Sequence, residues 1–193
     1  MSVESAGQIR RIIKQKRQDF SKTPSFIQDS ETAGNNIEII IRGMDNIRSV
    51  LCFYPIRDEI RLMGLYERLL GDYELYFPVT GEVSLLFYRV DDLADSSFSP
   101  GKMGVLEPCD RSVEFKAPEA QSSIAIVPGL AFSPVSMGRI GYGKGYYDRF
   151  LAAFYGIYTI GAGFEFQLVD ELPIEKWDIP LNMIVTEHGI YGK

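Results

Sequence analysis

The sequence predicts a single-domain α/β fold with a mostly parallel central sheet and helices on both faces, a Rossmann-like three-layer sandwich. The 193 residues match the size of one domain and contain no internal repeat or linker-like tract, so we expect residues 1–193 to form one domain. Apolar runs such as 49–54 and 124–127 lack polar alternation, which is typical of strands buried on both faces. These runs alternate with helical patterns, as parallel strands joined by helices require.

At the N-terminus the pattern predicts a helix over 5–20 and a second helix over 25–42, separated by Pro24. Isoleucines form an apolar face of the first helix, while Arg10, Lys14 and Arg17 recur every three or four residues on another. This second face is either a solvated basic surface or a source of cations for a phosphate group.

The remaining elements continue the alternation. We expect strands over 49–54, 73–79, 84–90, 124–127, 158–164 and 183–186, and helices over 59–70 and from 146 onward. Residues 91–100 and 111–123 are predicted to be loops, and 165–177 to contain a short helical patch.

Composition and charge argue against several classes of function. The formal charge of −6 disfavours a nucleic-acid-binding protein. No apolar stretch reaches 18 residues and no signal-like segment opens the chain, so we expect no membrane span and a cytoplasmic, monomeric protein. Two cysteines, Cys52 and Cys109, are too few for a disulfide framework or a metal cluster. A single histidine, His188, disfavours a Ser-His-Asp or Cys-His mechanism and favours catalysis by positioning and electrostatics.

Most of the candidate chemistry lies in a glycine-rich segment between the strand at 124–127 and the helix from 146. The segment contains Gly138, Arg139, Gly141, Gly143, Lys144 and Gly145. Glycines let backbone N–H groups approach an anion, and a helix N-terminus adds partial positive charge, so the segment is suited to bind phosphate. Its spacing fits a P-loop except that Gly145 stands where Ser or Thr would hold Mg²⁺, and Asp148 could supply that oxygen instead. The alternative is a glycine-rich turn without a ligand.

The residues PGLAF, 128–132, and GRIGYGKGYYDRFL, 138–151, closely resemble the signature of the 5-formyltetrahydrofolate cyclo-ligase (5,10-methenyltetrahydrofolate synthetase) family. Weaker similarity covers most of the chain, including DEI at 58–60, GVLEP at 104–108 and WDIP at 177–180. The resemblance implies ATP- and Mg²⁺-dependent conversion of 5-formyltetrahydrofolate to 5,10-methenyltetrahydrofolate with release of ADP and phosphate.

The resemblance also implies roles for individual residues. It assigns ATP to Arg10, Arg139, Ile140, Gly141, Tyr142, Gly143, Lys144, Gly145, Tyr146 and Tyr147, with Lys144, Arg139 and Tyr146 as catalytic groups. It assigns the folate to Ile56, Glu59, Arg61 and Tyr146, and Mg²⁺ to Asp148 and Asp178. The chain departs from the family pattern at several positions, among which Ala6 replaces a lysine, Arg61 an acidic residue and Trp177 a histidine.

Other interpretations of the same residues stay open at this point. Asp58 and Glu59 could be first-turn acids that favour the helix dipole rather than folate ligands. The protein could be a non-catalytic folate- or nucleotide-binding member of the family. It could also be a sugar-phosphate enzyme on a similar fold that uses the glycine-rich segment for a substrate phosphate.

Overall fold

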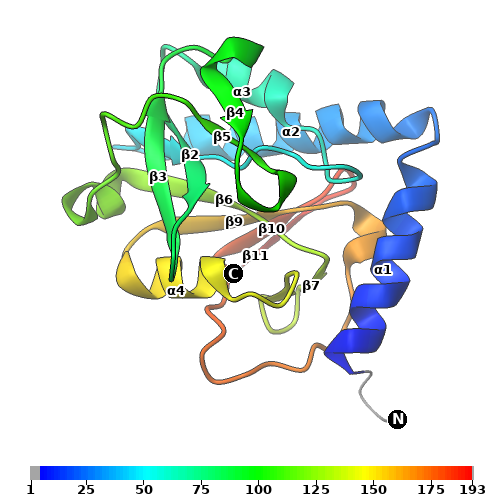
Figure 1. The fold of residues 1–193 in the computed structure, drawn as a ribbon. Helices are drawn as coiled ribbons and strands as arrows, with labels where there is room; N and C mark the ends of the chain where they lie inside the picture. The colour runs from blue at the N-terminus through cyan, green and yellow to red at the C-terminus, as the bar shows by residue number, and fades with distance from the viewer. Residues whose placement is uncertain (1–4, 193) are drawn as a thin grey trace.

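The computed structural model describes residues 5–192 and contains a central seven-stranded sheet in the order β11-β10-β9-β6-β1-β2-β3 (Figure 1). The sheet strands are β1 (Ser49–Leu51), β2 (Glu74–Thr80), β3 (Leu85–Val90), β6 (Ser123–Pro128), β9 (Tyr158–Ala162), β10 (Met183–Val185) and β11 (Ile190–Gly192). The five central strands are parallel to one another, whereas the edge strands β3 and β11 pair antiparallel with β2 and β10. The predicted mostly parallel α/β sheet is therefore confirmed.

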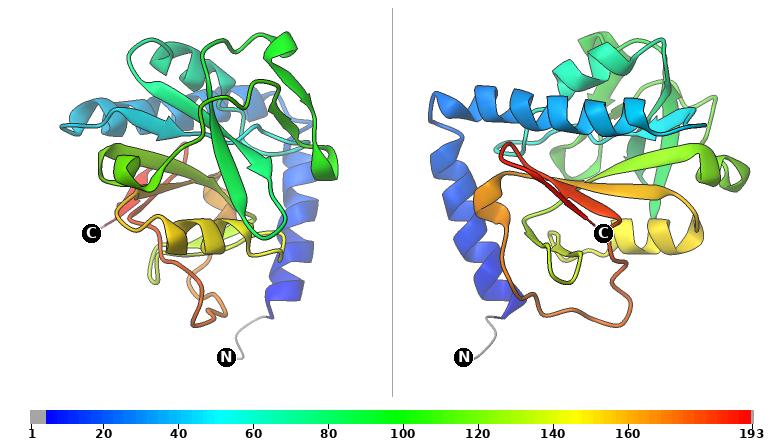
Figure 2. Two further views of the ribbon diagram at one scale, coloured as in Figure 1. Left: turned by 60° about the vertical axis from the view of Figure 1, so that its left-hand side comes forward. Right: turned by 180° about the vertical axis from the view of Figure 1, so that it is seen from behind.

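Helices cover both faces of this sheet (Figure 2). Side chains in β6 alternate between the two faces, as the period of a strand requires. Ile124 and Ile126 pack in a core cluster with residues of α2 (Ser25–Gly43) and α3 (Met63–Leu69). Val127 packs in a second cluster with residues of α4 (Tyr146–Ala153). These two cores on opposite faces confirm the three-layer arrangement.

The first helix, α1 (Ala6–Phe20), stands across one end of the sheet instead of covering a face (Figure 1). A capping box between Ser5 and Gln8 fixes where it begins. Ile9 and Ile13 pack against residues of a small hairpin formed by β7 (Ala131–Ser133) and β8 (Gly138–Ile140). The N-terminal helix is thereby held beside the glycine-rich segment.

The helix predicted over 59–70 is wrong in its first turn, because α3 begins only at Met63. Residues 57–62 form a turn in which Arg57 adopts a left-handed φ of 51°. One tertiary and one local hydrogen bond stabilise this segment: the Arg61 N–H donates to Ser30 Oγ at 3.1 Å, and the Glu59 carboxylate accepts a bond from the Ile56 N–H at 3.1 Å. Asp58 and Glu59 are therefore not the first-turn acids of a helix.

Several short elements lie in segments predicted to be loops or left unassigned. They are the hairpin β7–β8, the strands β4 (Phe98–Pro100) and β11, and the 3₁₀ turns η1 (Asp95–Ser97) and η3 (Ala117–Ser122). The 3₁₀ turn η2 (Lys102–Gly104) and the strand β5 (Leu106–Pro108) follow β4, and the 3₁₀ turn η4 (Glu165–Gln167) lies in the segment predicted to contain a short helical patch. Strands of three residues are too short to show periodicity, and partners distant in sequence determine their pairing. Within residues 5–192, no helix has the length and apolar character needed to cross a bilayer.

Candidate functional site

A cleft of about 930 Å³ opens at the carboxyl ends of β1 and β6. Phe53 and Tyr54 line it just after β1, and Pro128 and Gly129 line it at the end of β6. Ligands of open α/β sheets bind outside the carboxyl ends of the strands. The position of the cleft therefore follows from the sheet topology.

Nearly all residues predicted to bind ligands line this single cleft. All ten residues predicted for ATP line it: Arg10, Arg139, Ile140, Gly141, Tyr142, Gly143, Lys144, Gly145, Tyr146 and Tyr147. Ile56 and Glu59, predicted for the folate, and Asp148 and Asp178, predicted for the metal, line it as well. Arg61 does not: it is exposed, and its guanidinium donates to the Arg57 carbonyl at 3.0 Å.

The glycine-rich segment forms a loop that connects β8 to the N-terminus of α4. Gly143 and Gly145 have φ values of 91° and 65°, which favour glycine over residues with a side chain. The Arg10 Nε donates to the Gly141 carbonyl at 2.9 Å and so ties α1 to this loop. Lys144 is exposed at the cleft, and its ammonium makes no hydrogen bond or ion pair with any other part of the chain between residues 5 and 192. It is available to an anionic ligand.

Arg139 and Asp148 form an ion pair of 2.9 Å inside the cleft. The Arg139 side chain is only 6% exposed, yet its Nε has no hydrogen-bond partner among the described residues. A buried N–H without a partner is costly, and a phosphate oxygen would satisfy it. Arg139 can thus bind Asp148 and an anion at the same time.

Asp148 and Asp178, the two residues predicted to hold the metal, both line the cleft, and the Asp178 carboxylate accepts a hydrogen bond from the Glu175 N–H at 2.9 Å. Asp148 Oδ1 lies 3.5 Å from the Ile179 backbone nitrogen, one residue beyond Asp178 in the chain. Within residues 5–192 no group of three or more histidine, cysteine or acidic side chains could hold a metal alone. Mg²⁺ usually binds one or two carboxylates and completes its octahedron with waters and substrate phosphates. Two carboxylates in the same cleft as a glycine-rich loop suited to phosphate are therefore chemically compatible with a magnesium–nucleotide complex.

On the other side of the cleft, Glu59 is 7% exposed, and both of its oxygens accept hydrogen bonds. The Ile56 N–H donates to one oxygen at 3.1 Å and the Tyr142 hydroxyl to the other at 3.3 Å. Burial raises the pKa of Glu59, and the charge of Arg17 opposes this shift. Burial, followed by the charge of Glu59, raises the pKa of Tyr142 to about 12.

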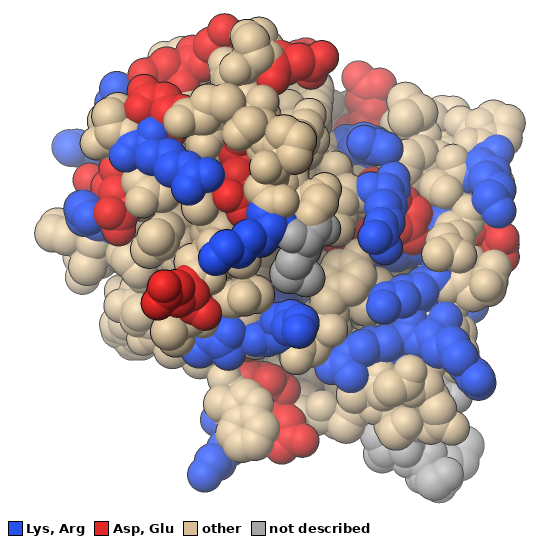
Figure 3. Space-filling model, in the orientation of Figure 1, with Lys and Arg blue, Asp and Glu red and all other residues tan. Residues whose placement is uncertain are grey.

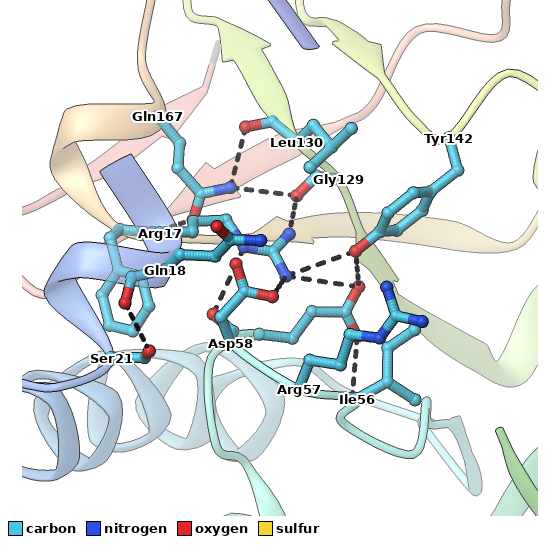
Figure 4. Close-up of polar contacts among 12 residues, drawn as sticks. Arg17, Gln18, Ser21, Ile56, Arg57, Asp58, Gly129, Leu130, Tyr142 and Gln167 are labelled. Carbon is cyan, nitrogen blue, oxygen red and sulfur yellow. Dashed lines mark hydrogen bonds and ion pairs between the residues drawn. The ribbon is translucent and has the colours of Figure 1, made fainter. Parts of the chain in front are cut away.

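Arg17, expected on a solvated basic face or near phosphates, is instead 1% exposed and pairs with Asp58 at 3.1 Å (Figure 4). The sequence contains a signal for this position: Arg17 continues the four-residue spacing of Ile9 and Ile13, which both face the core. A helix position that continues an apolar stripe is buried whatever its residue type.

Five cationic and four acidic side chains line the cleft, whereas the chain as a whole carries a formal charge of −6. The cationic side chains that line it are Arg10, Arg57, Arg139, Lys144 and Arg149. Figure 3 shows Lys and Arg side chains gathered on the face between α1 and β3. Cationic side chains in a concave site attract anions where no acidic side chain pairs with them, as at Lys144 among the described residues.

Comparison with known proteins identifies the family of this chain. The model of the 5-formyltetrahydrofolate cyclo-ligase family matches residues 2–187. The chain belongs to the 5-formyltetrahydrofolate cyclo-ligase family. It is 37% identical to the 5-formyltetrahydrofolate cyclo-ligase of Escherichia coli (strain K12) over 149 residues, 74% of this chain and 80% of the relative. The cyclo-ligase of Haemophilus influenzae is 25% identical over 187 residues, 94% of this chain and 97% of the relative.

Solved structures agree with this cyclo-ligase assignment. The NMR structure of the Aquifex aeolicus 5,10-methenyltetrahydrofolate synthetase matches with a TM-score of 0.79 and 27% identity, covering 97% of this chain and 92% of the other. The Mycoplasma pneumoniae 5,10-methenyltetrahydrofolate synthetase, at 20% identity, shares the fold with a TM-score of 0.75 over 95% of this chain and 99% of the other. Membership of the cyclo-ligase family implies a ligase of folate one-carbon metabolism that acts on 5-formyltetrahydrofolate, and it argues against a sugar-phosphate enzyme.

Proposed function

We propose that this protein closes the ring of 5-formyltetrahydrofolate to 5,10-methenyltetrahydrofolate, using ATP with Mg²⁺ and releasing ADP and phosphate. One observation carries the proposal. A single cleft is bordered by a phosphate-suited glycine loop on one side and by a buried carboxylate, Glu59, on the other. Two ligands that must react with each other would meet in that cleft.

The chemistry explains why ATP is needed. The N5-formyl group is an amide, so attack by N10 on its carbon would have to expel an oxide ion, a very poor leaving group. Transfer of the γ-phosphoryl group to the formyl oxygen releases ADP and converts that oxygen into part of a phosphate leaving group. N10 then attacks the carbon and loses its proton, and phosphate departs as the ring closes. Such transfer depends mainly on alignment and charge neutralisation, in line with a chain that has one histidine.

We assign the phosphates to Lys144, Arg139 and Arg10, together with the N–H groups of the loop glycines. The exposed ammonium of Lys144 and the unpartnered Nε of Arg139 support this assignment. Arg10 is held against the loop by its bond to the Gly141 carbonyl. Tyr146 also lines the cleft, and its ring is proposed to contact both nucleotide and folate.

We assign Mg²⁺ to Asp148 and Asp178, whose carboxylates would hold it against the nucleotide. When bound, the ion neutralises charge on the phosphate oxygens. Arg139 keeps the Asp148 carboxylate oriented through its 2.9 Å contact. On the folate side, the carboxylate of Glu59 accepts hydrogen bonds, and Ile56 offers an apolar surface to the pterin ring. Arg61, outside the cleft, would reach the folate only if its side chain changed rotamer.

The test is incubation of the purified protein with ATP, Mg²⁺ and 5-formyltetrahydrofolate, with methenyl absorbance and ADP release followed together. We expect both to rise in a 1:1 ratio and to stop when EDTA removes Mg²⁺. Folate binding without methenyl formation would instead support the non-catalytic alternative. The monomeric state stays a prediction, which size-exclusion chromatography with light scattering tests. The cytoplasmic location stays a prediction.

A further inference from the structure

Arg17 makes contacts with three segments that are far apart in sequence (Figure 4). Its Nε donates to the Asp58 carbonyl at 3.2 Å and its Nη2 to the Asp58 carboxylate at 3.1 Å. Its Nη1 lies 3.5 Å from the Gly129 carbonyl at the end of β6. Its Nη2 also donates to the Tyr142 hydroxyl of the glycine loop at 3.3 Å. One buried guanidinium therefore joins α1, the turn after β1, the end of β6 and the glycine loop.

The Tyr142 hydroxyl connects Arg17 to the folate side of the cleft. It accepts a hydrogen bond from Arg17 and donates one to Glu59 Oε1 at 3.3 Å. Tyr142 belongs to the loop assigned to the nucleotide, and Glu59 is assigned to the folate. The Tyr142 hydroxyl thus joins the two halves directly, and the Arg17 guanidinium holds that hydroxyl from a second side.

The charged side chains around this connection are buried and depend on one another for pairing. Arg17 lies 3.1 Å from Asp58 and 3.9 Å from Glu59, and the side chains of all three residues are largely removed from water. Buried charges are strongly destabilising unless paired with good geometry, and a planar guanidinium can satisfy several acceptors at fixed angles. Gln167, in the 3₁₀ turn η4 that follows β9, adds a further contact to this site, since its Nε2 donates to the Gly129 carbonyl at 2.9 Å.

We propose that Arg17 is a positioning residue that couples the nucleotide half of the cleft to the folate half through Tyr142 and Glu59. Nucleotide bound against the glycine loop restrains Tyr142. This holds Arg17 and Glu59 in the arrangement that accepts the folate. Binding of one ligand then strengthens binding of the other, and by thermodynamic linkage the effect is equal in both directions. The inference rests on the proposed function, because it requires both ligands to occupy the cleft together.

The coupling is measured by calorimetric titration of 5-formyltetrahydrofolate, without and with a saturating non-hydrolysable ATP analogue and Mg²⁺. The ratio of the two dissociation constants is the coupling factor. We expect a factor of at least about 5 in the wild-type protein, in the usual range for linked sites. Titrating the analogue without and with the folate should give the same factor.

Two variants test the connection. Arg17→Lys keeps the buried positive charge but loses the fork that reaches Asp58, Gly129 and Tyr142 together. Tyr142→Phe removes only the hydroxyl, on a residue that is 40% exposed, so it is expected to fold. In both variants the coupling factor should fall to about 1–2. A loss of stability alone would lower the melting temperature without changing this ratio.

Arg42→Lys is the matched control. Arg42 also makes three hydrogen bonds, to Glu38, Asp72 and the Arg68 carbonyl, but it does not line the cleft. It should keep the wild-type factor. A wild-type factor near 1, or full coupling in Tyr142→Phe, overturns the inference, even if Arg17→Lys fails to fold. If the wild-type protein binds neither ligand, the proposed function itself fails, and that result is distinct from binding without coupling.

Discussion

Replacing Lys144 by alanine tests the proposed phosphate contact, because the substitution should lower activity with little effect on the stability of the fold. The Lys144 side chain is exposed and has no ion pair or hydrogen bond within residues 5–192, so little folding energy is lost with it. Exposed substitutions of this kind usually change stability by within about 0.5 kcal/mol. For a chain of 193 residues that corresponds to a melting-temperature shift of at most about 2 °C.

The expected loss of activity is much larger. A donor directed at charge that develops in the transition state contributes about 2.7–4 kcal/mol, so its removal lowers kcat by about 10²–10³-fold. We expect Lys144→Ala to lower the rate of methenyl formation by this amount at saturating ATP and folate. The assay pairs initial rates with thermal melting of the same preparations.

Lys16→Ala is the control, because Lys16 is an exposed lysine on α1 that does not line the cleft. It should leave both the rate and the melting temperature unchanged. The reasoning is refuted if folded Lys144→Ala turns over within about twofold of wild type, since the loop would then not direct this ammonium at the transferred phosphoryl group.

Three further predictions concern the metal, the folate and the core. Asp178→Asn should raise the Mg²⁺ concentration for half-maximal rate by about 10-fold with an unchanged melting temperature; an unchanged Mg²⁺ requirement would remove Asp178 from the metal site. Protonation of Glu59 removes a hydrogen-bond acceptor, so folate affinity should fall as pH is lowered through a midpoint above the ordinary glutamate pKa of about 4.3, because burial raises the pKa of this group. A midpoint at or below that value in calorimetric titrations would contradict the role. Gly161→Ala should destabilise the fold by about 1–3 kcal/mol in urea unfolding, because its Cβ would lie 2.6 Å from Leu181 Cδ1. Gly43→Ala is the control, because its added Cβ would have no atom within 4 Å, and it should not lower the free energy of unfolding.

Local patterns were sufficient to predict the sheet and the phosphate-suited loop. The runs at 49–54 and 124–127 became β1 and β6, because a strand covered on both faces needs apolar residues at successive positions. The glycines and cations of the loop are contiguous in sequence, so their proximity to one another requires no knowledge of the fold. The segment at 59–70 shows the limit of periodicity, since tertiary hydrogen bonds to Ser30 and within the turn delay the helix to Met63.

What the amino-acid sequence determined by itself was the order of the longer strands and helices, the identity of the phosphate-suited loop and, through its motifs, the family. The tertiary structure alone decided which charges are buried and which partners they have. Arg17 contacts Asp58, 41 residues away in sequence, and Tyr142, 125 residues away. Glu59 lines the cleft, whereas the Arg61 side chain lies outside it. The physical reason is that burial and pairing of a charge depend on segments brought together only when the sheet and its covering helices assemble.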